Sequence, residues 1–212
     1  MQKNVEQIFA EKLLAVKAIK LQPTSPFTWA SGWKSPIYCD NRKTLSFPAL
    51  RNFVKTQLTR LIMERFPEAD AVAGVATGAI AQGALVADAL HLPFVYVRSS
   101  AKDHGLANLI EGELRPGMKV VVVEDLISTG GSSLKAVEAL RAIEGIEVVG
   151  MVAAFTYGFG VAETAFAQAG IRLETLTNYA TVVETAAATG YITPEQIDTL
   201  NQWRTAPAEW QG

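Results

Sequence analysis

Apolar positions repeat at helical spacing near the start of the chain. Six apolar residues there fall near one face of a helix, while most charged residues lie elsewhere, so a helix is predicted that ends before Pro23 and Pro26. The six are Val5, Ile8, Phe9, Leu13, Val16 and Ile19. The following residues 27–39 are predicted to be extended, with a turn at Ser31 and Gly32.

From residue 69 onward, short apolar runs alternate with helical patterns. The runs predict strands at residues 69–75, 93–97, 119–124, 147–155 and 171–176. Helices are predicted at residues 46–65, 79–90, 131–143 and 161–168. Continuous β-branched runs indicate strands buried on both faces of a sheet. The alternation therefore predicts an α/β fold with a five-stranded, mainly parallel sheet flanked by helices, which binds ligands at the carboxyl ends of its strands.

The composition is that of a globular protein and disfavours several classes of function. The 212 residues are 49% hydrophobic, and 19 Lys and Arg against 21 Asp and Glu leave a net charge of −2, which disfavours a general nucleic-acid binder. One cysteine, Cys39, excludes an internal disulfide and a Cys-rich zinc site. No apolar run reaches the ~20 residues of a membrane span, and residues 1–20 hold no signal-peptide core. We expect a cytoplasmic protein without a membrane or nucleic-acid partner.

The segment after the four valines at residues 120–123 carries the strongest chemical signal. The predicted strand delivers two adjacent acids, Glu124 and Asp125, and a turn of small residues then opens a helix. Free backbone N–H groups at a helix N-terminus favour a phosphate, whereas the carboxylates suit hydroxyls or hydrated Mg²⁺. The loop therefore predicts a ligand that combines a phosphate with a diol, such as a ribose 5-phosphate.

Other phosphate motifs do not match this loop. No Lys follows the glycines as it does in a Walker A loop, and no complete GxGxxG occurs, since the fragment at Gly158 and Gly160 has Glu163 in the third position. An ordinary strand–helix turn, in which Ser and Thr cap the helix, is the remaining alternative. Capping alone does not call for a pair of carboxylates at the strand end.

The segment resembles the phosphoribosyl-pyrophosphate (PRPP) motif of type I phosphoribosyltransferases. The resemblance implies that Glu124 and Asp125 hold the ribose hydroxyls, with either acid also available to Mg²⁺, which is otherwise bound through PRPP and water. It implies that the loop cradles the 5-phosphate. The loop residues are Ser128, Thr129, Gly130, Gly131 and Ser132.

Residues 27–42 indicate which type I phosphoribosyltransferases the chain resembles most. They contain Ser31-Gly32-Trp33-Lys34-Ser35-Pro36, which is similar to the N-terminal signature of orotate phosphoribosyltransferases. That similarity implies that Lys34 and Tyr38 bind orotate. The positive charge of the lysine is consistent with this role, because orotate carries a carboxylate. By its residues alone, Lys34 is more readily explained as a solvated lysine in a turn.

A long polar connection at residues 98–117 gathers three candidate cations, Arg98, Lys102 and His104. It resembles the mobile catalytic loop of the same family, in which the loop closes over pyrophosphate and its tip reaches the neighbouring subunit. The resemblance implies that Arg98 and Lys102 bind pyrophosphate, that His104 assists with Asp103 as its partner, and that the protein is a homodimer. Without the resemblance, a solvated charged loop is the alternative.

A third loop, at residues 74–79, matches the pyrophosphate-binding turn of the family and offers Thr77 and Gly78. Three positions depart from the pattern. The turn at residues 74–79 lacks the Lys that some relatives place there, and Ser99 stands where many relatives have a Lys. No Arg follows Phe155, where some relatives bind the orotate carboxylate. Tyr157 and Ser128 are then the further candidates for binding orotate.

The resemblance implies one domain over residues 1–212, with a core at about 46–178 and a small hood from residues 1–40 and part of 179–212. It implies a pentosyltransferase that converts orotate and PRPP to orotidine 5′-phosphate and pyrophosphate, with Mg²⁺, in the de novo biosynthesis of the pyrimidine nucleotide UMP. The candidate catalytic residues are Lys102, His104 and Asp125. A phosphoribosyltransferase for a purine base and a non-catalytic regulator that senses PRPP are the alternatives.

Overall fold

The computed structural model describes residues 3–29, 32–100 and 109–210. The chain divides into two compact units, which we call the hood unit (residues 1–44 and 177–212) and the core unit (residues 45–176). One domain with a hood stays a prediction.

The core unit is built on a six-stranded sheet in the order β10-β9-β8-β5-β6-β7. Its strands are β5 (Ala71–Val75), β6 (Phe94–Val97), β7 (Ile110–Glu111), β8 (Lys119–Ile127), β9 (Glu147–Thr156) and β10 (Leu173–Asn178). The pairs β5/β6, β5/β8 and β8/β9 are parallel, and β6/β7 is antiparallel. The predicted α/β class is confirmed.

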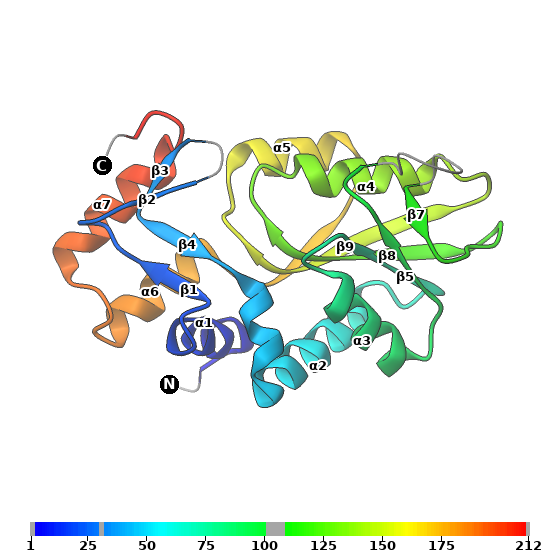
Figure 1. The fold of residues 1–212 in the computed structure, drawn as a ribbon, viewed down its shortest axis with the longest axis horizontal. Coiled ribbons are helices and arrows are strands. Elements are labelled where there is room, and N and C mark those ends of the chain that lie inside the picture. The colour runs from blue at the N-terminus through cyan, green and yellow to red at the C-terminus, as the bar shows by residue number, and fades with distance from the viewer. Residues whose placement is uncertain (1–2, 30–31, 101–108, 211–212) are drawn as a thin grey trace. The chain divides into compact units, whose positions relative to one another are not determined.

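Helices cover both faces of this sheet. Helices α2 (Pro48–Arg65) and α3 (Ile80–Leu90) lie on one face, and α4 (Gly131–Arg141) and α5 (Gly160–Gln168) lie on the other (Figure 1). On the α4 face, the side chains of Val120 and Val122 join Ala136 and Leu140 in one buried cluster. Because successive side chains of a strand alternate, Val121 and Val123, also fully buried, point to the α2/α3 face.

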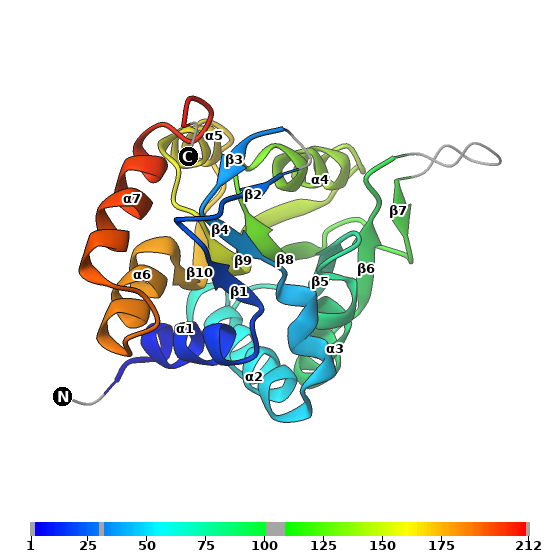
Figure 2. The ribbon, with the colours of Figure 1, turned by 60° about the vertical axis from the view of Figure 1, so that its left-hand side comes forward.

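Two details of the core differ from the sequence prediction. The predicted loop at residues 98–117 contains β7, a two-residue edge strand beside β6 in Figure 2, so the sheet has six strands and not five. A strand this short has no detectable apolar pattern. Strand β8 also runs to Ile127, beyond its predicted end at Glu124, because β9 continues beside it and pairs Leu126 with Phe155.

The connections create a switch point in the sheet. From β5 the chain passes to β6 on one side, whereas β8 pairs with the other side of β5. Loops that leave adjacent parallel strands in opposite directions open a crevice at their carboxyl ends, which is where open α/β sheets bind ligands. The segments at this crevice are residues 76–79 and 128–130.

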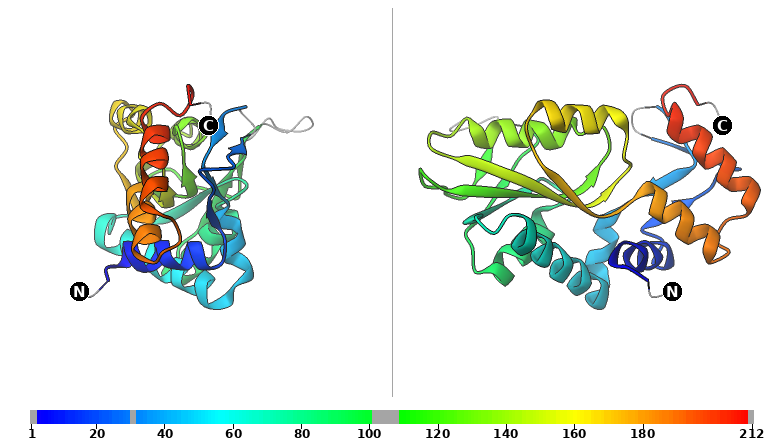
Figure 3. Two further views of the ribbon diagram at one scale, coloured as in Figure 1. Left: turned by 90° about the vertical axis from the view of Figure 1, so that its left-hand side faces the viewer. Right: turned by 180° about the vertical axis from the view of Figure 1, so that it is seen from behind.

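The hood unit combines both ends of the chain. Helix α1 (Val5–Ala15) packs on α6 (Tyr179–Ala188), which is followed by α7 (Pro194–Thr205); α1 and α6 are the dark blue and orange helices of Figure 3. The first helix ends earlier than predicted, because Lys17 adopts a positive φ of 55°. Two small antiparallel sheets complete the unit: β1 (Ile19–Leu21) with β4 (Ile37–Cys39), and β2 (Phe27–Thr28) with β3 (Lys34–Ser35).

Candidate functional site

Two helices begin at the switch point of the core unit. Helix α3 follows β5 through residues 76–79, and α4 follows β8 through residues 128–130. Their N-caps, Ala79 and Gly130, make no side-chain capping hydrogen bond. The first N–H groups of both helices, with the positive ends of both helix dipoles, are therefore directed at the crevice without a capping side chain. This arrangement provides two neighbouring anion sites.

Glu124 and Asp125 lie on β8 and point to opposite faces of the sheet. Glu124 is 4% exposed and points to the α4 face. Its Oε2 accepts a hydrogen bond of 2.9 Å from the Ser133 hydroxyl, and its Oε1 accepts one of 2.9 Å from the Asp125 backbone N–H. The sequence predicted Glu124 at the end of the strand and Asp125 just after it, whereas the structure places both inside β8, which runs to Ile127.

Burial raises the pKa of the Glu124 carboxyl from 4.5 to about 8, and the negative charge of Asp125 acts in the same direction. The hydrogen bonds from the Asp125 N–H and the Ser133 hydroxyl partly oppose this rise by favouring the charged form. The carboxyl groups of Glu124 and Asp125 therefore differ in their environment, since the first is buried and the second is partly open to solvent.

The Asp125 carboxyl lies directly against Gly78. A Cβ added at Gly78 would come within 2.7 Å of Asp125 Oδ1 and closer still to Cγ and Oδ2. Only glycine leaves room for the carboxyl at this position. The structure therefore brings together the turn that leads into α3 and the Asp125 carboxyl of β8, the strand that leads into α4. A carboxylate at this position can accept ligand hydroxyls or hold a hydrated cation.

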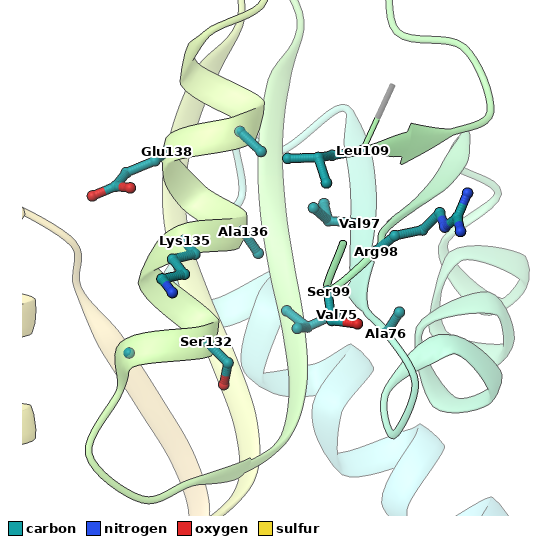
Figure 4. Close-up of a pocket in the computed structure, with 12 residues that line it drawn as sticks. Val75, Ala76, Val97, Arg98, Ser99, Leu109, Ser132, Lys135, Ala136 and Glu138 are labelled. Atoms are coloured by element: carbon teal, nitrogen blue, oxygen red, sulfur yellow. The ribbon is translucent and has the colours of Figure 1, made fainter. Parts of the chain in front are cut away.

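A cavity of about 660 Å³ opens beside this crevice, between α4 and the ends of β5 and β6 (Figure 4). Of the predicted site residues, Arg98, Gly131 and Ser132 line it. The other lining residues are Val75, Ala76, Val97, Ser99, Leu109, Lys135, Ala136, Glu138 and Ala139. Its wall is mostly apolar near the sheet and polar along α4.

Arg98, at the base of the predicted catalytic loop, is held by an acid. Its Nη1 lies 3.5 Å from Glu111 Oε1 on β7, and both side chains are about 30% exposed (30% and 28%). In Figure 4 the guanidinium extends to the side opposite Ser132. The other residues predicted for this loop, Lys102, Asp103 and His104, lie outside the described residues.

The predicted orotate-binding residues belong to both units. In the core unit, Tyr157 is 3% exposed and its ring stacks on Phe159 at 5.4 Å. In the hood unit, Lys34 is exposed on the β2–β3 hairpin, where its Nζ donates to Thr28 Oγ1 at 2.9 Å, and Tyr38 is 38% exposed. Trp203 supports this hairpin through a hydrogen bond from its Nε1 to the Lys34 carbonyl. A role of these residues in binding orotate stays a prediction.

Sequence reasoning missed Ser133 and Lys135. Ser133 follows the predicted phosphate loop and holds Glu124, and Lys135 lines the cavity from the second turn of α4. Helical spacing would have placed Lys135 on the same side of α4 as Ser132, three residues earlier. Nothing in the sequence shows that Ser133 faces Glu124, because that contact depends on how α4 packs against β8.

A divalent cation would find few protein ligands here. Within the described ranges, no three His, Cys, Asp or Glu side chains come together as a metal cage. Mg²⁺ usually keeps several waters and binds through one or two carboxylates plus substrate phosphates. The Asp125 carboxylate beside two anion sites fits that mode, with Glu124 next to it. None of the helices in the described ranges has the length and apolar character needed to cross a membrane.

Comparison with known proteins decides the family. Residues 52–165 match the phosphoribosyl transferase domain. The chain is 74% identical, over 208 residues, to the orotate phosphoribosyltransferase of Bacteroides thetaiotaomicron, with 98% of each chain covered. The chain belongs to the orotate phosphoribosyltransferase family.

Solved structures agree with this membership. The crystal structure of orotate phosphoribosyltransferase from Aeropyrum pernix is 30% identical, with a TM-score of 0.75 over 87% of this chain and 99% of that chain. The Mycobacterium tuberculosis H37Rv orotate phosphoribosyltransferase in complex with PRPP is 26% identical, with a TM-score of 0.64 over 84% of this chain and 99% of that chain. The type I phosphoribosyltransferase fold predicted from the motifs is therefore confirmed.

Proposed function

We propose that the protein transfers the phosphoribosyl group of PRPP to orotate, giving orotidine 5′-phosphate and pyrophosphate. The observation that carries this proposal is the Asp125 carboxyl packed against Gly78, in the turn that leads into the uncapped N-terminus of α3, while the strand of Asp125 leads into the uncapped N-terminus of α4. PRPP has a phosphate at one end, a pyrophosphate at the other and two ribose hydroxyls between them. The phosphate and the pyrophosphate correspond to the two helix N-termini, and the ribose hydroxyls correspond to the Asp125 carboxyl.

Each group of PRPP, and orotate itself, is assigned to its own set of residues. The α4 loop, from Ser128 to Ser132, binds the 5-phosphate through its N–H groups and hydroxyls. Asp125 and Glu124 accept the ribose hydroxyls. The turn with Thr77 and Gly78 receives the pyrophosphate at the N-terminus of α3. We assign the remaining pyrophosphate contacts to Arg98, Lys102 and His104, and orotate to Lys34, Tyr38, Ser128 and Tyr157.

The chemistry is a substitution at the anomeric carbon. The bond from this carbon to the pyrophosphate oxygen breaks, and a bond to a ring nitrogen of orotate forms as that nitrogen loses its proton. Positive charge develops on the ribose and negative charge on the leaving group, so catalysis depends on positioning and electrostatic stabilisation. The Asp125 carboxylate beside the ribose stabilises the positive charge, and cations with helix N-termini stabilise the negative one.

Mg²⁺ would be held by Asp125, with Glu124 adjacent, together with the oxygens of PRPP and water. When bound, it neutralises part of the charge of the pyrophosphate. The chain's own contribution is to hold PRPP extended between the two helix N-termini, so that the anomeric carbon faces the base.

The choice of base is tested by mixing the protein with PRPP and Mg²⁺ and each candidate base in turn. We expect orotate to be consumed, measured by its ultraviolet absorbance, with pyrophosphate released in equal amount. If a purine were consumed and orotate were not, the protein would be a phosphoribosyltransferase for a purine base. PRPP binding without turnover of any base would instead indicate a sensor.

The catalytic loop is tested by Lys102→Ala. Because the lysine would neutralise the leaving pyrophosphate, we expect kcat to fall by about 10²- to 10³-fold, as for other well-placed charge donors. Near-full turnover of this variant would exclude the loop from catalysis.

We further propose a cytoplasmic homodimer in which this loop completes the partner's site. Two inactive variants, Lys102→Ala and Asp125→Asn, test it when mixed and allowed to exchange subunits. Recovery of activity is expected, because each mixed dimer holds one intact site. No recovery, with a dimer confirmed by light scattering, would show that each site uses its own loop.

A further inference from the structure

Ser133 joins the phosphate loop to the buried acid. It lies in the first turn of α4, is 1% exposed, and donates its hydroxyl to Glu124 Oε2 at 2.9 Å. The other oxygen of the same carboxyl accepts the Asp125 N–H, also at 2.9 Å. The Glu124 carboxyl is therefore held at both oxygens, once by the helix and once by its own strand.

Two bonds from different elements fix the rotation of a side chain that otherwise has several torsions. An unprotonated carboxyl oxygen has two acceptor sites, so a Glu124 oxygen that carries no proton still has one site to offer after these bonds. Without the Ser133 bond, the end of the side chain would be free to turn about its last torsion, which is soft. Its acceptor site would then lose a defined direction.

We infer that Ser133 is a positioning residue, whose hydroxyl orients the Glu124 carboxyl to accept a ribose hydroxyl of PRPP. This inference rests on the proposed function. The bond also couples the two halves of the PRPP site, because Ser133 belongs to the helix turn whose N–H groups face the 5-phosphate. A phosphate bound at α4 would thereby hold the ribose acceptor in place.

The first test is the variant Ser133→Ala. We expect kcat/KM for PRPP to fall by about 10- to 100-fold, which is the usual cost of leaving a buried polar group without its hydrogen-bond partner. KM for orotate at saturating PRPP should stay near the wild-type value, since orotate does not contact this pair. Ser133→Thr keeps a hydroxyl and should recover most of the loss, whereas Ser133→Cys, with a weak donor of similar size, should not.

A double-mutant cycle separates positioning from a general effect on the fold. In a Glu124→Met background the acid is absent, so Ser133→Ala should cost almost nothing further in kcat/KM for PRPP. Thr59→Val provides the control, because it removes a hydroxyl of the core unit that has no hydrogen-bond partner among the described residues. Its kinetics should match the wild type.

Three outcomes are distinct. A selective loss for PRPP that vanishes without Glu124 supports the inference. Equal losses in both backgrounds, or a uniform loss together with a lower Tm in the Ala and Cys variants alike, would overturn it and leave Ser133 a structural residue. If the wild type itself forms no orotidine 5′-phosphate, the proposed function fails, and PRPP affinity by calorimetry then tests Ser133 separately.

Discussion

Replacing Gly78 by alanine should disable the site while leaving the fold in place. The backbone at Gly78 does not have the positive φ that disfavours alanine. The added methyl group, however, would lie 2.7 Å from Asp125 Oδ1 and closer to Cγ and Oδ2. The substitution therefore acts on one functional side chain and tests the central contact of the proposed site.

The size of the effect follows from the geometry. Ordinary van der Waals contact begins at 3.4 Å, so Oδ1 must retreat by 0.7 Å (3.4 minus 2.7) and the other two atoms by more. The carboxyl thus moves by about 1 Å, and a displacement of that size at a reacting centre costs about 10²-fold in rate. Rotating it off its preferred rotamer costs about 0.5–1.5 kcal/mol of stability.

The assay compares kcat/KM for PRPP and the Tm of Gly78→Ala with those of Gly160→Ala. A Cβ at Gly160 meets no atom within 4 Å, so this control should match the wild type. In an Asp125→Ala background the clash is absent, and Gly78→Ala should cost little more. Wild-type activity of Gly78→Ala, or a full additional loss without the Asp125 carboxyl, would refute the assignment of this contact to catalysis.

Two further predictions concern stability. Because the pKa of Glu124 is raised from 4.5 to about 8 in the folded protein, the folded state holds a proton that the unfolded state has lost between these values. Stability should therefore fall as the pH rises from about 4.5 to 8, by up to about 1.4 kcal/mol per pH unit. Urea unfolding across this range should show a flatter dependence for Glu124→Gln, and equal slopes would contradict the shift. On β9, a Cβ at Gly150 would lie 2.6 Å from Phe66 Cζ, so Gly150→Ala should destabilise the core unit by about 1–3 kcal/mol. An unchanged urea midpoint would show that the Phe66 ring can move aside.

Much of the core could be predicted from the order of apolar and polar residues. Buried parallel strands need continuous apolar runs, so the four valines of β8 and their neighbours indicate the sheet directly. The two acids and the small residues after them are adjacent in the sequence, so the phosphate loop is a local pattern. The edge strand β7 could not be predicted, since two residues carry no periodicity.

The ends of elements and the contacts between distant segments depended on the tertiary structure. Where β8 ends is decided by β9, which pairs with it as far as Ile127 and so draws Asp125 into the strand together with Glu124. Strand alternation then sends Glu124 to Ser133 and Asp125 to Gly78. The sequence by itself determined which chemical groups the site contains. Only the packing of helices on the sheet decided that Glu124 is buried beside Ser133 and that Asp125 is partly exposed beside Gly78, because burial depends on neighbours that are remote along the chain.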